Sequence, residues 1–320
     1  MTIMKALRFA KYGPPPVLSI QQLPVPDLKP GEALVELHAS AINPSDVKNV
    51  AGVFKASLPR IPGRDFAGVV VAGDGWTGKE VWGSGAGFGV SHDGTHAQYV
   101  VVSSDGLSEK PASLSMEQAS AVGVPYLAAW SGLVDAANIQ PGETVLITGA
   151  LGAVGKAATQ IAYWKKAKVI GADISDKSSD VDAFINTRAK ELPVEVKALT
   201  NGKGADLVFD AVGGPMFEPC LKSLRLGGRQ VAITSIGSGR VEFSLVDFYH
   251  NLSRLIGVDT MKLTGPAIAK IMDELRAGFE DGYLRTSPVQ SWSLDQAIDA
   301  YTAVEKGTGL SKHVFLPRRN

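Results

Sequence analysis

The spacing of apolar and polar residues changes along the chain and divides it into regions of different structure. In residues 1 to about 122, side chains mostly alternate in the pattern of strands, and prolines and glycines interrupt the pattern at short intervals. The strand candidates lie at 5–9, 32–38, 68–72, 80–83 and 96–102. Short strands separated by frequent turns predict a partly open β-barrel.

From about residue 123, apolar strands alternate with helical segments. Strands are predicted at 144–148, 168–172, 206–210, 230–234 and 255–259, with a further short one at 183–185. This alternation is typical of a doubly wound parallel sheet, and it makes the fold class α/β.

The tail of the chain does not continue that alternation. It predicts helices at 266–277 and 294–304 and a last strand at 313–316. We therefore predict that the tail returns to the first domain. One domain would comprise 1–122 and 263–320, and the other 123–262.

A glycine-rich turn follows the strand predicted at 144–148. Gly149, Gly152 and Gly155 have the spacing G-x-x-G-x-x-G, and a helix at 153–164 and a second strand ending at Asp173 follow. Such a turn lets a pyrophosphate approach the backbone and the helix N-terminus, so it predicts a dinucleotide site. The phosphate-binding loop of nucleotide hydrolases fits poorly, because Ala157 stands where that loop needs Ser or Thr. A packing turn without a ligand is the alternative.

Asp173 bears on the choice of cofactor. A carboxylate at the end of the second strand accepts hydrogen bonds from the ribose hydroxyls of NADH and repels the 2′-phosphate of NADPH. The sequence therefore favours NADH. Ser175 and Lys177 could offer a donor and a charge to a phosphate, so NADPH remains possible.

Composition limits the partners and the metal chemistry. The 320 residues include 32 Lys plus Arg and 32 Asp plus Glu, a balance that argues against nucleic acid or an anionic membrane as the main partner. Residues 1–10 lack the apolar core of a signal peptide and no apolar run could span a bilayer, so we expect a cytoplasmic protein. The single cysteine, Cys220, excludes an intramolecular disulfide and a cysteine-based zinc site.

Several separated motifs resemble those of one family, and in the same order. These motifs lie at 41–48, 62–68, 94–100, 149–155, 204–214 and 311–314. They make the chain similar to the medium-chain dehydrogenase/reductase superfamily, in its zinc-independent quinone oxidoreductase and enone reductase branch. The resemblance implies a GroES-like β-barrel domain joined to a Rossmann domain.

The resemblance also implies that no zinc is used. The zinc alcohol dehydrogenases of this superfamily have a ligating cysteine in the first motif, where Asn43 and Ser45 stand here, and a His-Glu pair where Arg64 and Asp65 stand. Without a metal to polarise an alcohol or ketone oxygen, substrates that need less activation are favoured. We therefore expect hydride transfer to a quinone or to the β-carbon of an α,β-unsaturated carbonyl compound.

Asn43, Lys48 and Tyr126 are the candidate catalytic residues. Lys48 would bind the cofactor or the enone oxygen, or would be a solvated surface lysine. Asn43 would hold the nicotinamide ribose or stabilise its own turn. Tyr126 would offer a hydrogen bond or proton to the substrate, or would only pack. For Asp65 an ion pair with Arg64 is expected, and acid catalysis is the alternative. Asp46 could pair with Lys48 or Arg64 for structure alone.

The resemblance places the cofactor on the glycine turn, on the ends of two later strands and on the last motif. The predicted cofactor-binding residues are Asn43, Gly149, Ala150, Gly152, Ala153, Val154, Gly155, Asp173, Ile174, Ala211, Val212, Gly213, Ser235, Ile236, Gly237 and Lys312. Phe248, Tyr249 and His250 would overhang the substrate or belong to the core. Residues 255–260 resemble the edge strand through which family members form homodimers. Two other functions stay open: a dinucleotide-binding structural or redox-sensing protein with little turnover, and a zinc-free alcohol or ketone reductase.

Overall fold

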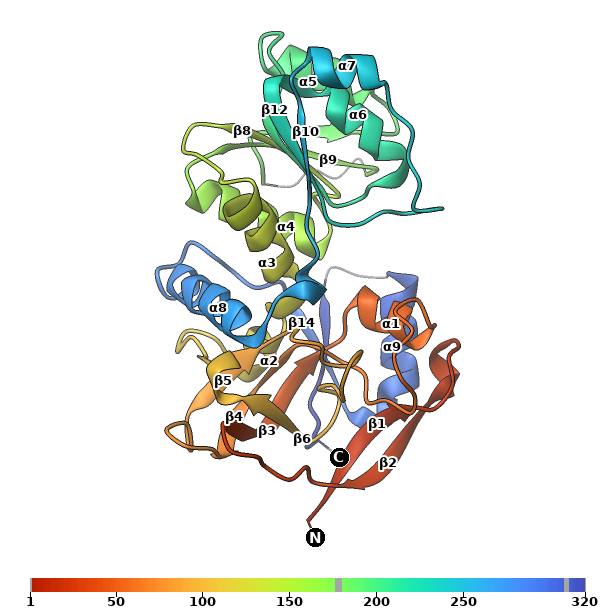
Figure 1. The fold of residues 1–320 in the computed structure, drawn as a ribbon, viewed down its shortest axis with the longest axis vertical. Helices are drawn as coiled ribbons and strands as arrows, with labels where there is room; N and C mark the ends of the chain where they lie inside the picture. The colour runs from red at the N-terminus through yellow and green to blue at the C-terminus, as the bar shows by residue number, and fades with distance from the viewer. Residues whose placement is uncertain (1, 176–179, 308–310, 320) are drawn as a thin grey trace. The chain divides into compact units, whose positions relative to one another are not determined.

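The computed structural model describes residues 2–175, 180–307 and 311–319, and it divides into two compact units (Figure 1). Unit 1 comprises the chain up to Val124 and again from Met261, and unit 2 comprises Pro125–Thr260. Lys177 lies outside the described residues. None of the described helices is long and apolar enough to cross a lipid bilayer.

Unit 1 is built mainly on antiparallel strands, and the pair β14–β15 is parallel. Its largest sheet has the order β14-β15-β3-β4-β5-β7, and β6 also pairs with β3. The strands of this sheet are β3 (Glu32–Ala41), β4 (Phe66–Ala72), β5 (Glu80–Gly83), β6 (Tyr99–Ser103), β7 (Ser108–Glu109), β14 (Val289–Trp292) and β15 (Lys312–Phe315). A separate pair joins β1 (Ile3–Phe9) to β2 (Leu18–Pro24). In β3 the alternate residues Ala33, Val35 and Leu37 are fully buried, as the period-2 pattern predicts.

The C-terminal segment of the chain belongs to unit 1. Its strand β15 pairs antiparallel with β3, so Val314 lies opposite Ala41. Helix α8 (Gly265–Glu280) buries Ile268, Met272 and Leu275 along one face. The other helices of unit 1 are α1 (Pro44–Val50), α2 (Met116–Ser120) and α9 (Ala297–Lys306), and α3 (Gly123–Trp130) crosses the unit boundary.

Unit 2 contains a parallel sheet of six strands in the order β10-β9-β8-β11-β12-β13. The strands are β8 (Thr144–Thr148), β9 (Lys168–Asp173), β10 (Ala183–Asn186), β11 (Ala205–Asp210), β12 (Leu224–Ala232) and β13 (Arg254–Gly257). The helices are α4 (Ala153–Trp164), α5 (Leu192–Leu199), α6 (Phe217–Lys222) and α7 (Leu245–His250). The chain order reverses between β8 and β11, and ligands of such sheets bind beside the carboxyl ends of the strands at that point.

The structure corrects one predicted strand. The sequence pattern placed a strand at 230–234, but β12 begins at Leu224 and ends at Ala232. Gly227 and Gly228 hid its first half, because glycines normally mark a break in a strand. Gly227 has a φ of 73°, and the pairing register between β11 and β12 shifts in this region.

Candidate active site

The predicted glycine turn follows β8 at the carboxyl edge of the parallel sheet. Gly149 has a φ of 62°, and a Cβ on Gly155 would lie 2.2 Å from the carbonyl oxygen of Gly149. Gly152 is the N-cap of α4, whose first turn has no acidic residue. The N–H groups at the start of α4 are therefore left to bind an anion such as a pyrophosphate. The other predicted residues of this region lie in the turn or in the first turn of α4: Ala150, Ala153 and Val154.

A buried aspartate at the end of β11 shapes the next predicted cofactor loop. Asp210 Oδ1 accepts the N–H groups of Val212 and Gly213 at 3.1 and 2.9 Å. It also accepts the hydroxyl of Thr148 at 2.7 Å, and the Thr148 oxygen accepts the Ala211 N–H at 3.0 Å. Sequence reasoning missed Asp210 and Thr148. The sequence feature that could have found them is a polar residue at the end of each of two apolar strands, β8 and β11, between which the strand order reverses.

The predicted loop after β12 lies against the loop after β11. The Ile236 N–H donates to the Val212 carbonyl at 3.2 Å. A Cβ on Gly213 would lie 2.3 Å from the backbone between β12 and this loop, and Gly213 and Gly237 have positive φ values of 65° and 74°. Ser235 continues this loop and is exposed. The structure therefore brings the two predicted cofactor loops together.

The Asp173 carboxylate lies beside the glycine turn. Its Oδ2 accepts the Leu151 N–H at 3.0 Å, and its Oδ1 accepts the Ile174 N–H at 2.7 Å. Each oxygen has a second lone pair, so the carboxylate is held in place and can still accept a ribose hydroxyl. Ser175 follows on the same segment and is half-buried.

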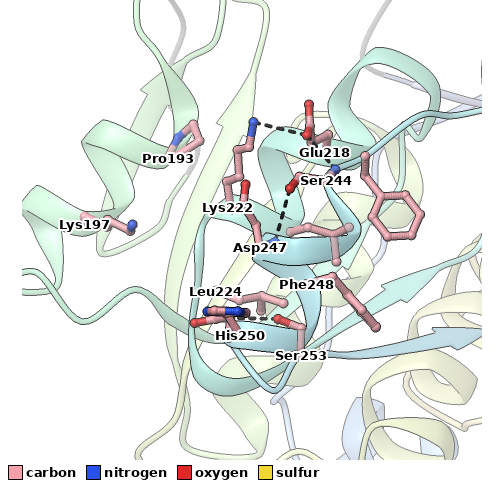
Figure 2. Close-up of a pocket in the computed structure, with 13 residues that line it drawn as sticks. Pro193, Lys197, Glu218, Lys222, Leu224, Ser244, Asp247, Phe248, His250 and Ser253 are labelled. Carbon is pink, nitrogen blue, oxygen red and sulfur yellow. Dashed lines mark hydrogen bonds and ion pairs between the residues drawn. The ribbon is translucent and has the colours of Figure 1, made fainter.

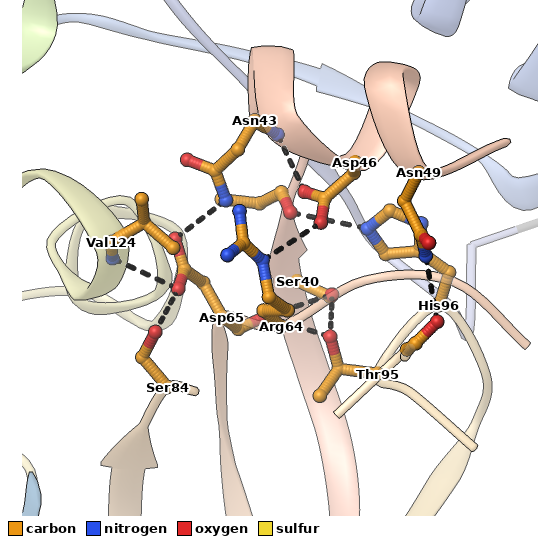
Figure 3. A network of polar contacts seen from close by, with 12 residues as sticks. Ser40, Asn43, Asp46, Asn49, Arg64, Asp65, Ser84, Thr95, His96 and Val124 are labelled. Atoms are coloured by element: carbon orange, nitrogen blue, oxygen red, sulfur yellow. Dashed lines mark hydrogen bonds and ion pairs between the residues drawn. The ribbon is translucent and has the colours of Figure 1, made fainter. Parts of the chain in front are cut away.

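Unit 1 contains a buried chain of polar contacts that includes Asn43 and Lys312. Figure 3 shows the part of it around Asn43 and Asp65. The Lys312 ammonium donates to Asn43 Oδ1, and Asn43 Nδ2 donates to Asp65 Oδ2 at 2.9 Å. Asp65 Oδ1 accepts the Ser84 hydroxyl and the Val124 N–H at 3.0 Å. Burial raises the pKa of Asp65 and lowers the pKa of Lys312, and each residue's charge opposes the shift of the other.

Asp65 does not pair with Arg64, contrary to the prediction. Arg64 Nε instead donates to Asp46 Oδ1 at 3.2 Å, and both side chains are buried. Asp46 Oδ2 accepts the Asn43 N–H at 2.8 Å, which joins this ion pair to the chain of contacts (Figure 3). Among the described residues, Arg64 Nη2 has no hydrogen-bond partner.

Lys48 and Tyr126 lie in opposite environments. Lys48 is on the exposed side of α1, and it forms no ion pair within the described part of the chain. Tyr126 is buried in unit 2, where Gln160 Nε2 donates to its hydroxyl at 3.1 Å. Burial raises the pKa of Tyr126. This environment favours packing over proton donation for Tyr126.

A buried histidine supports the sheet of unit 1 below α1. His96 Nε2 donates to the Ala41 carbonyl at 3.1 Å, so the ring nitrogen Nδ1 accepts the Tyr301 hydroxyl at 2.9 Å. Burial lowers the pKa of His96, which agrees with a neutral ring. The residue is a structural link between the barrel strands and α9.

Phe248 and His250 lie away from the carboxyl ends of the parallel strands, where the predicted cofactor loops are. Both line a hollow of about 530 Å³ in unit 2 that also includes Leu224, the first residue of β12, and Ser253, which precedes β13 (Figure 2). These are the amino-terminal ends of parallel strands, opposite to the ends where the cofactor loops lie. The interpretation of this segment as an overhang above the substrate is therefore wrong.

A parallel sheet with a glycine turn where its strand order reverses and a barrel-like unit with a buried polar centre are together typical of two-domain oxidoreductases. The profile described as the alcohol dehydrogenase GroES-like domain matches residues 29–112, and the profile described as zinc-binding dehydrogenase matches 153–275. The chain belongs to the medium-chain dehydrogenase/reductase superfamily, in its quinone oxidoreductase branch, and is an oxidoreductase. The predicted fold class, a GroES-like domain with a Rossmann domain, is confirmed.

Individual relatives match over nearly the full length of the chain. A zinc-type alcohol dehydrogenase-like protein of Schizosaccharomyces pombe is 34% identical over 93% of each chain. The quinone oxidoreductase of Homo sapiens is 28% identical over 98% of each chain. A solved structure described as an NAD-dependent alcohol dehydrogenase is 30% identical with a TM-score of 0.87, covering 98% of this chain and 99% of that one.

One matching profile and the Schizosaccharomyces pombe relative are named for zinc, but the residues of this chain do not fit a zinc site. The described residues contain no group of three His, Cys, Asp or Glu side chains that could hold a metal ion. In the two motifs where the zinc enzymes have ligands, the Asp46 carboxylate already pairs with Arg64, and the charge of Lys312 acts on Asp65. A divalent ion there would have to displace a buried cation.

Proposed function

We propose that this protein transfers hydride from a nicotinamide cofactor, preferably NADH, to a quinone or to the β-carbon of an α,β-unsaturated carbonyl compound. The observation that carries the proposal is the buried chain Lys312–Asn43–Asp65, which stands where a zinc enzyme would hold its metal. It provides fixed hydrogen-bonding groups and a positive charge without a Lewis acid. The quinone oxidoreductases among the relatives support this substrate class.

Unit 2 supplies the cofactor contacts in this proposal. The free N–H groups at the start of α4 bind the pyrophosphate, and Asp173 accepts the hydroxyls of the adenine ribose. The loops 211–213 and 235–237 contact the nicotinamide end. When bound, the reduced nicotinamide supplies the hydride.

Asn43 has one defined orientation, and that suits a positioning role. Lys312 can only donate and the Asp65 carboxylate can only accept, so the amide oxygen must face Lys312 and the amide nitrogen must face Asp65. In the proposal Asn43 and Lys312 hold the ribose and amide of the nicotinamide. The exposed ammonium of Lys48 donates a hydrogen bond to the carbonyl oxygen of the substrate, where negative charge develops. Water supplies the final proton.

Asp173 makes NADH the preferred cofactor. Its two backbone bonds hold the carboxylate beside the turn, where a 2′-phosphate would meet its negative charge. NADPH remains possible as the weaker cofactor.

We also propose that the protein forms a homodimer through β13. This strand is at the edge of the parallel sheet, and an unpaired strand edge can pair with a second copy. Exposed apolar side chains lie on or next to it: Leu252, Leu255 and Tyr249. A mass near twice 33.7 kDa in solution is expected, and a monomer at micromolar concentration would contradict this proposal.

The test compares NADH and NADPH oxidation by the purified protein against one quinone and one short-chain enone, with a chelator present and no added metal. Saturable turnover with NADH, unchanged by the chelator, supports the proposal. Tight cofactor binding without turnover of either acceptor would indicate a binding protein instead. Faster oxidation of simple alcohols than reduction of either acceptor would indicate an alcohol or ketone reductase.

A further inference from the structure

Unit 1 contains a cavity that shares one residue, Ser84, with the buried chain of polar contacts and none with the proposed cofactor contacts. Its volume is about 650 Å³, within the range of small-molecule sites, and all of its lining residues belong to unit 1. Ile61, Phe66, Phe88 and Ile268 line it with apolar side chains, and each of them is at most 3% exposed. The cavity therefore presents a fixed apolar floor for the body of a ligand.

The charged side chains that line this cavity are all acidic. Glu32, Asp93 and Asp105 contribute carboxylates, and no lysine or arginine is among the lining residues. Each carboxylate uses one oxygen within unit 1: Glu32 Oε2 and Asp93 Oδ1 accept backbone N–H groups at 2.9 and 3.0 Å, and Asp105 Oδ1 accepts a serine hydroxyl at 2.6 Å. Asp93 Oδ1 also lies 3.4 Å from Arg60, which is outside the lining. In the described residues, the second oxygen of each carboxylate has no such partner.

One strand forms a wall of the cavity. All five residues of β6 line it, and within the described residues this strand pairs only with β3. A strand paired on one side leaves both N–H and C=O groups along its other edge, so this wall offers hydrogen bonds but does not select the charge of a ligand. The carboxylates are the groups that favour a ligand that donates hydrogen bonds and carries positive charge.

A loop of constrained backbone holds one side of the cavity. Ala86 has a φ of 49°, and its glycine neighbours on both sides also have positive φ values. His92 Nε2 donates to the Ala86 carbonyl at 2.8 Å, and the His92 ring packs edge-on against Phe88 with 4.8 Å between the ring centroids. Non-glycine residues in this region of φ are uncommon and occur often at binding sites. These contacts within the loop hold it in one conformation, so this wall of the cavity is preformed.

We infer that this cavity binds an amphipathic organic amine. The aromatic or aliphatic body of the ligand packs on Phe66, Phe88 and Ile268, and its ammonium group lies between Glu32 and Asp105 at the rim. An anion of the same shape would meet like charge and bind poorly. None of the proposed cofactor or substrate contacts lines the cavity, so its test uses binding alone.

Dansylcadaverine and N-dansyl-6-aminohexanoate form a matched pair of probes, because they share the dansyl group and a flexible chain and differ in the charge at its end. Fluorescence titration of the 320-residue protein, with saturating NAD⁺ present, measures the affinity for each probe. We expect dansylcadaverine to bind with a blue shift and at least about tenfold more tightly than the carboxylate probe. Equal affinities, or tighter binding of the carboxylate probe, would overturn the inference.

Substitutions at the rim locate the bound probe. The double variant Glu32→Gln, Asp105→Asn should weaken dansylcadaverine about tenfold and leave the carboxylate probe unchanged or slightly tighter. Asp74→Asn, which removes an exposed acid outside the cavity lining, is the matched control and should bind dansylcadaverine like the parent protein. If the double variant and the control bind dansylcadaverine equally, the probe is elsewhere and the inference fails.

Discussion

Replacement of Asp65 by asparagine tests whether the buried polar chain of unit 1 is balanced in charge. Three donors surround the carboxylate, from Asn43, Ser84 and the Val124 backbone, so an asparagine must turn its NH₂ group toward a donor. The change also leaves Lys312 without its nearest compensating charge. Loss of one partner of a buried charge pair costs about 3–5 kcal/mol, which for a unit of this size lowers the melting temperature by about 6–20 °C.

Calorimetry of Asp65→Asn, Lys312→Met and the double variant measures this effect, with Asp74→Asn as the control for loss of an exposed carboxylate. The two buried groups interact through Asn43, so the double variant should be about 1–3 kcal/mol more stable than the sum of the single changes predicts. Additivity of the two changes within about 0.5 kcal/mol would refute the reasoning. A melting temperature of Asp65→Asn equal to that of the control would refute it as well.

Three further substitutions test the proposed cofactor and substrate contacts. Asp173→Ser should shift the ratio of kcat/KM for NADH over NADPH toward NADPH by at least about tenfold, and an unchanged ratio would rule out this assignment. Gly155→Ala places a Cβ 2.2 Å from the backbone of the glycine turn and should abolish measurable NADH binding, whereas Gly257→Ala, with open space around it, should bind NADH normally. Lys48→Met should lower kcat for an enone by about tenfold or more without a change in melting temperature, and Lys11→Met, also exposed, serves as its control. Equal kcat values for these two lysine variants would leave Lys48 as a solvated surface residue.

The sequence predicted the helices and strands whose apolar residues recur with a clear period. It missed contacts that depend on the direction in which side chains point. The glycine turn, α4 and the end of β9 were predictable, because a parallel strand, a turn and a helix are local features. The pairing of Arg64 with Asp65 was predicted wrongly for a simple reason. Adjacent side chains near a strand project to different sides of the backbone, so Arg64 reaches Asp46 and Asp65 reaches Asn43.

The segment with Phe248 and His250 shows a second limit of local patterns. Its aromatic residues were compatible both with a substrate loop and with packing, and sequence alone does not say at which end of a parallel sheet a connecting segment lies. The structure places them beside Leu224, where β12 begins. Chemistry-bearing residues at the amino-terminal ends of such strands are separated from the cofactor by the length of the sheet.

The contact between Lys312 and Asn43 joins residues 269 positions apart, and it explains why the site can be stable without a metal. A buried ammonium alone would be strongly destabilising, as would the carboxylates of Asp46 and Asp65. With Arg64 and Lys312 the cluster has two positive and two negative groups, and the neutral Asn43 amide lies between one pair. The two cations therefore stabilise the folded protein, because they neutralise the buried carboxylates of Asp46 and Asp65 as a metal ion would. They also fix the direction of the Asn43 amide, because its oxygen faces Lys312 and its nitrogen faces Asp65, so the same contacts balance the charge and orient Asn43.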